Sequence, residues 1–273
     1  MNALIKLMRL NKPIGIWLLL WPSWQAAYLL TQTPDYKILI WLTLGTIVAR
    51  STGCVINDIC DINFDSKVAR TKQRPLACGA IKKQTAYIAA ITGMLICLVI
   101  ALQLPFMCWL LAIIAAGLII IYPLSKRWFI CPQLILGLAF AWPVLITTYA
   151  LGYDINTAPW WLFISSIIWP IAYDTLYAMT DKQDDLKLNL HSSAKWLGSY
   201  DLTGVIVCYI FWSFCWLIIA WQQQSIIMLT GLIISIVILA PKILKATTPK
   251  LCFSAFKVNQ YIGGILWLAI VWR

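Results

Sequence analysis

Aspartates that fall into two clusters are the residues of this sequence best suited to chemistry. All ten acidic residues are aspartate, and seven of them lie in the clusters. The other three are isolated and are interpreted as loop residues. The clustered residues are Asp58, Asp61 and Asp65 in the first group, and Asp174, Asp181, Asp184 and Asp185 in the second.

The spacing within the first cluster is helical. Asn57, Asp61 and Asp65 are four residues apart, and Asp58 precedes Asp61 and Asp65 with the i, i+3, i+7 spacing. Either pattern brings side-chain oxygens to one face of a helix. Because like charges at this spacing repel, the cluster needs cations to remain ionised.

The spacing within the second cluster is also helical. Asp174, Asp181 and Asp185 repeat at i, i+7 and i+11, with Tyr177 along the same stripe. Ligand sets made only of oxygen favour Mg²⁺, which typically bridges one or two carboxylates to substrate phosphates. We therefore predict a Mg²⁺ site formed by Asn57, Asp58, Asp61, Asp65, Asp181, Asp184 and Asp185. The alternative, that these residues are solvated helix ends, does not explain why they gather in two groups.

Basic residues lie next to the acids. Arg70 and Arg74 follow the first cluster directly, and Lys126 and Arg127 close a later apolar run. Guanidinium forks and lysine point charges suit diphosphate oxygens. We assign these four residues to diphosphate binding. The alternative is that they only mark one side of a membrane, as we conclude for Lys82 and the lysines near the C-terminus.

The elements that position these residues are predicted to be membrane helices. The chain of 273 residues is 62% hydrophobic and only 11% charged, which is too little charge to cover a soluble domain. Runs of about 20 apolar residues are long enough to span a bilayer as helices. Nine such runs predict an all-α bundle of nine transmembrane helices, one membrane-embedded domain over residues 1–273. The runs cover roughly 14–31, 38–58, 85–103, 105–123, 133–152, 159–179, 203–221, 225–241 and 257–272.

The distribution of basic residues predicts the orientation. With nine spans, all but a few of the 21 lysines and arginines fall on one side of the membrane, which marks that side as cytoplasmic. Both aspartate clusters lie on this side. The net charge of +11 does not indicate nucleic-acid binding, because the basic residues are separated by apolar runs. The nine cysteines are scattered singly, as expected of buried thiols rather than a metal site.

Several motifs resemble those of a known family. They are Asn57-Asp58-x-x-Asp61-x-x-x-Asp65, Arg70-Thr71-x-x-Arg74-Pro75, Tyr122-Pro123-x-x-Lys126-Arg127 and Tyr173-Asp174-Thr175-x-Tyr177-Ala178-Met179-x-Asp181-x-x-Asp184-Asp185. With them, the chain resembles the UbiA family of intramembrane aromatic prenyltransferases over nearly its whole length. The last motif resembles the branch of the family that acts on 4-hydroxybenzoate. The chain departs from the family in one visible place, since Asn11 stands where an aspartate is usual.

The resemblance implies an activity and a set of roles. The expected fold is a helical bundle around a cavity that opens laterally to lipid, in the inner membrane of a bacterium, with the active site facing the cytoplasm. The expected reaction transfers a polyprenyl group from polyprenyl diphosphate to the carbon ortho to the hydroxyl of 4-hydroxybenzoate, in ubiquinone biosynthesis. Mg²⁺ would be held by the catalytic residues Asp61, Asp65, Asp181 and Asp185.

The aromatic substrate is assigned to Arg50, Asp174 and Tyr177. Arg50 precedes Asn57 by about two helical turns and shares its face. Its partner is the carboxylate of the aromatic substrate or the diphosphate, and a structural role is a third possibility. Two other functions stay open: prenyl transfer to a different aromatic ring, and secondary transport. The sequence predicts neither the prenyl chain length nor the oligomeric state.

Overall fold

The computed structural model describes residues 3–68, 70–188 and 190–273, except for the side chains of residues 183–187. Every regular element in this part of the chain is helical, which confirms the predicted fold class. The elements are α1 (Ala3–Leu7), α2 (Ile14–Leu30), α3 (Tyr36–Cys60), α4 (Ile62–Asp65), α5 (Lys83–Ala101), α6 (Phe106–Ser125), α7 (Pro132–Ala150), η1 (Ile155–Thr157), α8 (Trp160–Lys187), α9 (Ser193–Leu197), η2 (Gly198–Tyr200), α10 (Asp201–Gln222), α11 (Ile226–Leu244) and α12 (Pro249–Val271).

Each predicted apolar run coincides with one long helix. Seven segments are long and apolar enough to cross a membrane: α3, α5, α6, α7, α11, the first 23 residues of α8, and a segment that contains α10. Helix α2 is apolar but has only 17 residues, and α12 is not among the seven. The protein is therefore a multi-pass membrane protein, and nine crossings remain a prediction.

Two helices extend well beyond their apolar runs. Helix α8 continues to Lys187 and α12 begins at Pro249, each about eight residues past the predicted boundary. Hydropathy falls where charged residues begin, but the backbone hydrogen bonds of a helix do not depend on hydropathy. The extra turns contain charged residues, among them Asp181 and Lys182 in α8 and Lys250 in α12.

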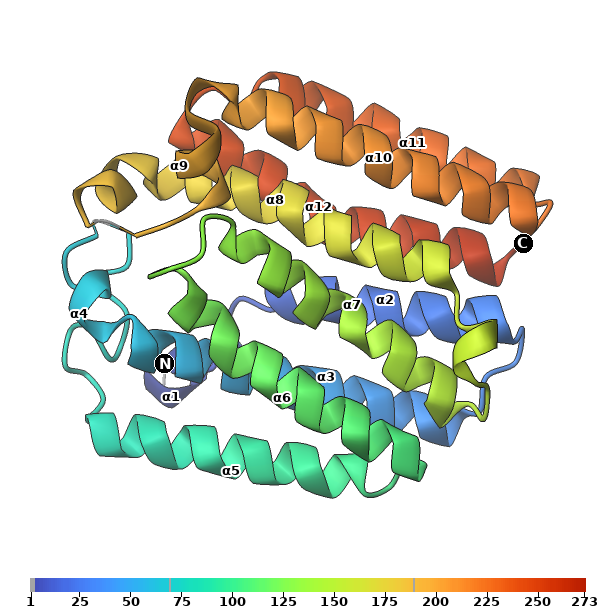
Figure 1. Ribbon diagram of the computed structural model, residues 1–273, viewed down its shortest axis with the longest axis horizontal. Coiled ribbons are helices and arrows are strands. Elements are labelled where there is room, and N and C mark those ends of the chain that lie inside the picture. The colour runs from blue at the N-terminus through green and yellow to red at the C-terminus, as the bar shows by residue number, and fades with distance from the viewer. Residues whose placement is uncertain (1–2, 69, 189) are drawn as a thin grey trace.

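Helix α8 lies at the centre of one half of the bundle, and α3 organises the other half. Helices α7 and α10 pack along α8, with α12 beside it, while α5 and α6 pack on α3. Helix α2 contacts α7, α12 and α3 and so joins the two halves. Figure 1 shows α5 on one face of the bundle and α10 and α11 on the opposite face.

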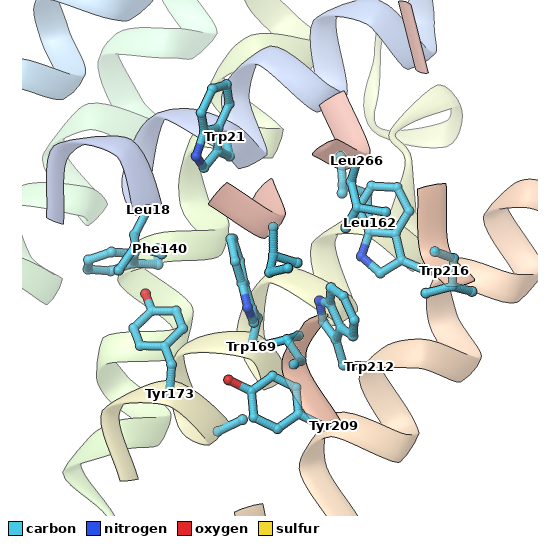
Figure 2. Packing of buried hydrophobic residues seen from close by; sticks show 14 of the residues in the cluster. Leu18, Trp21, Phe140, Leu162, Trp169, Tyr173, Tyr209, Trp212, Trp216 and Leu266 are labelled. Atoms are coloured by element: carbon cyan, nitrogen blue, oxygen red, sulfur yellow. The ribbon is translucent and has the colours of Figure 1, made fainter. Parts of the chain in front are cut away.

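Aromatic residues fill the core around α8. Figure 2 shows Trp169 between Tyr173 and Trp212. The centroid of the Trp169 ring lies 5.5 Å from that of Tyr173 and 6.3 Å from that of Trp212. Asn259 of α12 accepts hydrogen bonds from Trp169 Nε1 at 2.7 Å and from the hydroxyl of Tyr209 at 2.8 Å. Buried indole and phenol donors need such a partner. One asparagine thus ties α8, α10 and α12 together.

The charged segments meet at one end of the bundle. Helices α4 and α9 lie at the end away from the C-terminus (Figure 1). Ion pairs join the segments there: Lys126, directly after α6, pairs with Asp61 at the end of α3, and Arg70 of the 66–82 loop pairs with Asp181 of α8. The fold therefore brings together the carboxyl ends of α3, α6 and α8.

Candidate active site

A cavity of about 1330 Å³ runs through the middle of the bundle. Most of its wall is apolar, with Met94, Ala112, Ala116 and Ile119 among the residues that line it. Its charged part is built by predicted site residues. Those that line the cavity are Arg50, Asn57, Asp58, Asp61, Asp65, Arg70, Arg74, Lys126, Asp174, Tyr177 and Asp181.

The first cluster is buried where α3 ends and α4 begins. Asp58, Asp61 and Asp65 are 1%, 5% and 6% exposed. Lys126 Nζ donates to Asp61 Oδ2 at 2.7 Å and to Asn57 Oδ1 at 3.0 Å. Each of the three carboxylates has a basic partner, because buried carboxylates are stable only when paired.

Arg74 bridges two of these carboxylates. Its Nη1 donates to Asp65 Oδ2 at 2.7 Å and to Asp58 Oδ1 at 3.1 Å. Burial lowers the pKa of the Arg74 guanidinium, but the two carboxylates more than offset this and leave the pKa above its ordinary value. Burial also lowers the pKa of Lys126 and the neighbouring Asp61 raises it, and the net result is a raised pKa. Both bases therefore remain charged.

Asp174 and Asp181 of the second cluster line the same cavity. Arg70 donates through Nε to Asp181 Oδ1 at 2.9 Å and lies over the ring of Tyr177, with Cζ 4.5 Å from the centroid. The guanidinium also donates to the hydroxyl of Tyr177. The 66–82 loop thus reaches Asp65 with Arg74 and Asp181 with Arg70. The side chains of Asp184 and Asp185 lie outside the described residues.

Arg127, predicted to bind diphosphate, is not part of the cavity wall. Its guanidinium donates to the carbonyl oxygens of Cys60 at 2.7 Å and Pro123 at 3.1 Å. Its Nη2 lies 3.8 Å from Asp61 Oδ1. In this arrangement Arg127 fastens the end of α6 to the end of α3, and its neighbour Lys126 is the base that reaches the cavity.

Arg50 lines the cavity about two turns along α3 from Asn57. Its Nη1 contacts Cys54 Sγ at 3.0 Å, and its Cζ lies 5.8 Å from the centre of the Phe140 ring. The Nε atom of Arg50 and the hydroxyl of Tyr173 are buried and have no hydrogen-bond partner among the described residues. Buried donors without partners are rare in folded proteins and call for an explanation such as a ligand.

Asp174 also lines the cavity, and its neighbour Gln133 was not among the predicted site residues. Gln133 Nε2 donates to Asp174 Oδ2 at 3.3 Å, and its Oε1 accepts from the backbone N–H of Ser193 at 2.9 Å. Arg9, Gly15 and Tyr173 were missed as well. Tyr173 stands in one of the family motifs, but the spacing of residues predicts none of the contacts that these three residues make with distant parts of the chain.

The donors at the charged end suit Mg²⁺ chemically. The part of the chain that the structure describes holds no group of three or more Asp, Glu, His or Cys residues arranged as a metal cage. Mg²⁺, however, usually takes one or two carboxylates together with substrate phosphates rather than an all-protein cage. Asp61 Oδ1 is buried without a hydrogen-bond partner in the described residues. That oxygen and its neighbours fit a metal that arrives with a phosphate.

The fold and the site define a class of protein: a multi-pass membrane protein with an apolar cavity that carries charged residues at one end. The UbiA prenyltransferase family matches residues 17–267 of the chain. A 4-hydroxybenzoate octaprenyltransferase from Legionella pneumophila (strain Paris) is 40% identical, over 98% of this chain and 97% of the relative. One from Neisseria meningitidis serogroup C is 36% identical, over 99% and 93%.

Solved structures share the fold. A UbiA homolog from Aeropyrum pernix K1 aligns with a TM-score of 0.83 at 20% identity, covering 93% of this chain and 96% of that one. A homolog from Archaeoglobus fulgidus, bound to GPP and Mg²⁺, aligns with a TM-score of 0.75 at 14% identity over 100% of both chains. The chain belongs to the UbiA prenyltransferase family. This confirms the resemblance and removes the transporter alternative.

The pairing of Asp61 with Lys126 generates a stability prediction. Lys126→Met leaves the buried carboxylate of Asp61 with only the more distant Arg127, whose Nη2 lies 3.8 Å away, and we expect the free energy of unfolding to fall by about 3 kcal/mol. Thermal unfolding in detergent, followed by tryptophan fluorescence, measures the change. The double variant Lys126→Met/Asp61→Asn should recover most of the loss, because it removes both charges. If Lys126→Met costs no more than Met at the exposed Lys82, the pair does not stabilise the fold.

Proposed function

We propose that this protein transfers a polyprenyl group from polyprenyl diphosphate to the carbon ortho to the hydroxyl of 4-hydroxybenzoate, a step of ubiquinone biosynthesis. One observation carries the proposal. A single apolar cavity holds paired acids and bases at one end and, farther along α3, the buried Arg50 with an unpartnered Nε. The names of relatives 36–40% identical over nearly the whole chain support the choice of substrates.

The charged end is proposed to hold the diphosphate. Arg70, Arg74 and Lys126 line the cavity as cations, and such groups bind phosphate oxygens through charge-assisted hydrogen bonds. Asp61, Asp65 and Asp181, with Asn57, would hold Mg²⁺. When bound, the metal neutralises charge on the leaving diphosphate. The bases that pair with carboxylates in this structure are then shared with the phosphates.

The apolar wall is proposed to hold the prenyl chain and to protect the reacting carbon. Breaking the bond between carbon and diphosphate oxygen leaves an allylic carbocation, which water would capture. A wall of residues such as Ala112, Ala116 and Ile119 excludes water from this part of the cavity. The cation then reacts with the electron-rich ring carbon, which afterwards loses its proton.

Arg50 is proposed to bind the carboxylate of the aromatic acceptor, with Asp174 and Tyr177 beside the ring. All three line the cavity. The carboxylate would accept a hydrogen bond from the unpartnered Nε of Arg50. The positive charge of the guanidinium group attracts the carboxylate. A different aromatic acceptor with a carboxylate would meet the same arginine, so the acceptor must be tested directly. The distribution of basic residues supports a cytoplasmic location for the site.

Turnover in purified form tests the proposal. Protein in detergent or lipid, given Mg²⁺, 4-hydroxybenzoate and a polyprenyl diphosphate, should form a prenylated hydroxybenzoate detectable by mass spectrometry. Because the proposed metal ligands are oxygens that bind phosphate only through a cation, EDTA should abolish product formation, and excess Mg²⁺ should restore it. Full activity in EDTA would refute the metal role. Product with another acceptor only would refute the choice of substrate.

Arg50→Ala tests the acceptor site. Removing a charge-assisted hydrogen bond worth about 1.5–3 kcal/mol should raise KM for 4-hydroxybenzoate by roughly 10- to 150-fold. KM for the prenyl diphosphate should stay nearly constant. A rise in the KM of the prenyl donor instead would assign Arg50 to the diphosphate, and unchanged kinetics would make its role structural.

A second variant moves Arg50 without removing it. A Cβ on Gly15 would lie 2.3 Å from Arg50 Nε and 2.6 Å from Nη2, so Gly15→Ala must displace the guanidinium. We expect the same selective rise in KM for 4-hydroxybenzoate, but smaller. Gly117→Ala in α6 is the matched control, because a Cβ there meets nothing within 4 Å. Equal kinetics for the two alanine variants would contradict the proposed contact.

A further inference from the structure

Arg9 has a backbone conformation that few residues adopt. It lies between α1 and α2 with φ of 57°, in the left-handed region that residues other than glycine avoid. Side-chain contacts hold it there. Its Nη2 donates to both oxygens of Asp58, at 2.9 and 3.0 Å, and its Nη1 donates to the carbonyl oxygen of Lys6 at 3.0 Å. The conformation is stabilised by a partly buried ion pair with α3.

The partner of Arg9 is shared with the site. Asp58 is 1% exposed and also accepts from Arg74, which in turn donates to Asp65. Charges of alternating sign therefore run from Arg9 through Asp58 and Arg74 to Asp65. Arg9 and Arg74 both contact Oδ1 of Asp58, and Arg9 contacts Oδ2 as well. Asp58 therefore binds two arginines at once.

Packing fixes the same segment against the bundle. Leu7 is 0% exposed and packs in a cluster with Val55 of α3, Leu76 of the 66–82 loop and Ala86 of α5. Residues 6, 8, 9, 11 and 12 line the cavity. The N-terminal segment, residues 3–12, is thus a wall of the cavity beside the first aspartate cluster. Its apolar side is held by Leu7 and its charged side by Arg9.

We propose that Arg9 is a positioning residue: through Asp58 it fixes Arg74, and with it Asp65, and it holds the N-terminal segment against the cavity. Asp58 serves this chain of ion pairs rather than binding metal. The effect of Arg9 on catalysis rests on the proposed function, in which Arg74 binds the diphosphate. The pairing itself does not depend on that function.

Two measurements on the whole protein test the inference. The variants are Arg9→Gln, Asp58→Asn, the double variant, Arg9→Lys and the control Lys82→Gln, at an exposed lysine that does not line the cavity. Hydrogen exchange of the backbone amides in residues 3–12, read by mass spectrometry without ligand, reports the pairing. Steady-state kinetics report KM for each substrate. Melting temperatures identify any variant that fails to fold, and Arg9→Gln alters only a partly exposed side chain.

Loss of the pair should free the segment. We expect Arg9→Gln and Asp58→Asn each to speed exchange in residues 3–12 by about tenfold, and the double variant by no more than either single one. KM for the prenyl diphosphate should rise about tenfold, while KM for 4-hydroxybenzoate changes less than about twofold. Arg9→Lys should restore part of both effects, and Lys82→Gln should resemble the wild type.

Different results would refute the pairing, the positioning role or the proposed function separately. Unchanged exchange in Arg9→Gln, or additive effects in the double variant, would refute the pairing. Faster exchange with unchanged KM for the prenyl diphosphate would refute the positioning role while leaving the proposed function intact. If the wild type transferred no prenyl group to 4-hydroxybenzoate, the proposed function would fail, and the exchange measurements would still decide the pairing.

Discussion

A carboxylate taken out of water must be paired with a cation or lose its charge, and this constraint shapes one whole end of the molecule. The bases that satisfy it come from different parts of the chain: Lys126 from the end of α6, Arg74 from the 66–82 loop and Arg9 from the N-terminal segment. The pairs that neutralise the carboxylates therefore also join the segments that enclose the charged end of the cavity. Binding chemistry and cohesion of the fold use the same contacts.

The two regions of the cavity make complementary demands. An apolar wall excludes water and strengthens every charge interaction at its end, because the effective dielectric constant is low there. The same low dielectric makes the unpartnered Nε of Arg50 costly. An anionic group on an otherwise apolar ligand relieves that cost. In the proposed function, the diphosphate of the prenyl donor and the carboxylate of the aromatic acid are two anionic groups that bind at separate places in one apolar cavity.

Much of the fold could be predicted from the sequence, because apolar length decides which segments can lie in a bilayer. Helix ends could not, since α8 and α12 continue through charged turns where hydropathy gives no signal. Periodicity predicted the aspartate stripes, and adjacency in the sequence predicted the neighbouring bases. It could not separate Lys126, which reaches Asp61, from Arg127, which binds backbone carbonyls. Arg9 and Asp58 are 49 positions apart in the sequence, so local spacing does not predict their contact.

The central claim, that the paired carboxylates form the metal and diphosphate site, is tested most directly by binding. Isothermal titration of geranyl diphosphate into the protein with Mg²⁺ should be compared for wild type, Asp61→Ala and the exposed loop control Asp154→Ala. The account predicts that Asp61→Ala weakens binding by at least about 100-fold, while Asp154→Ala binds as the wild type does. Equal affinity for wild type and Asp61→Ala, or equal losses in the two variants, would contradict it.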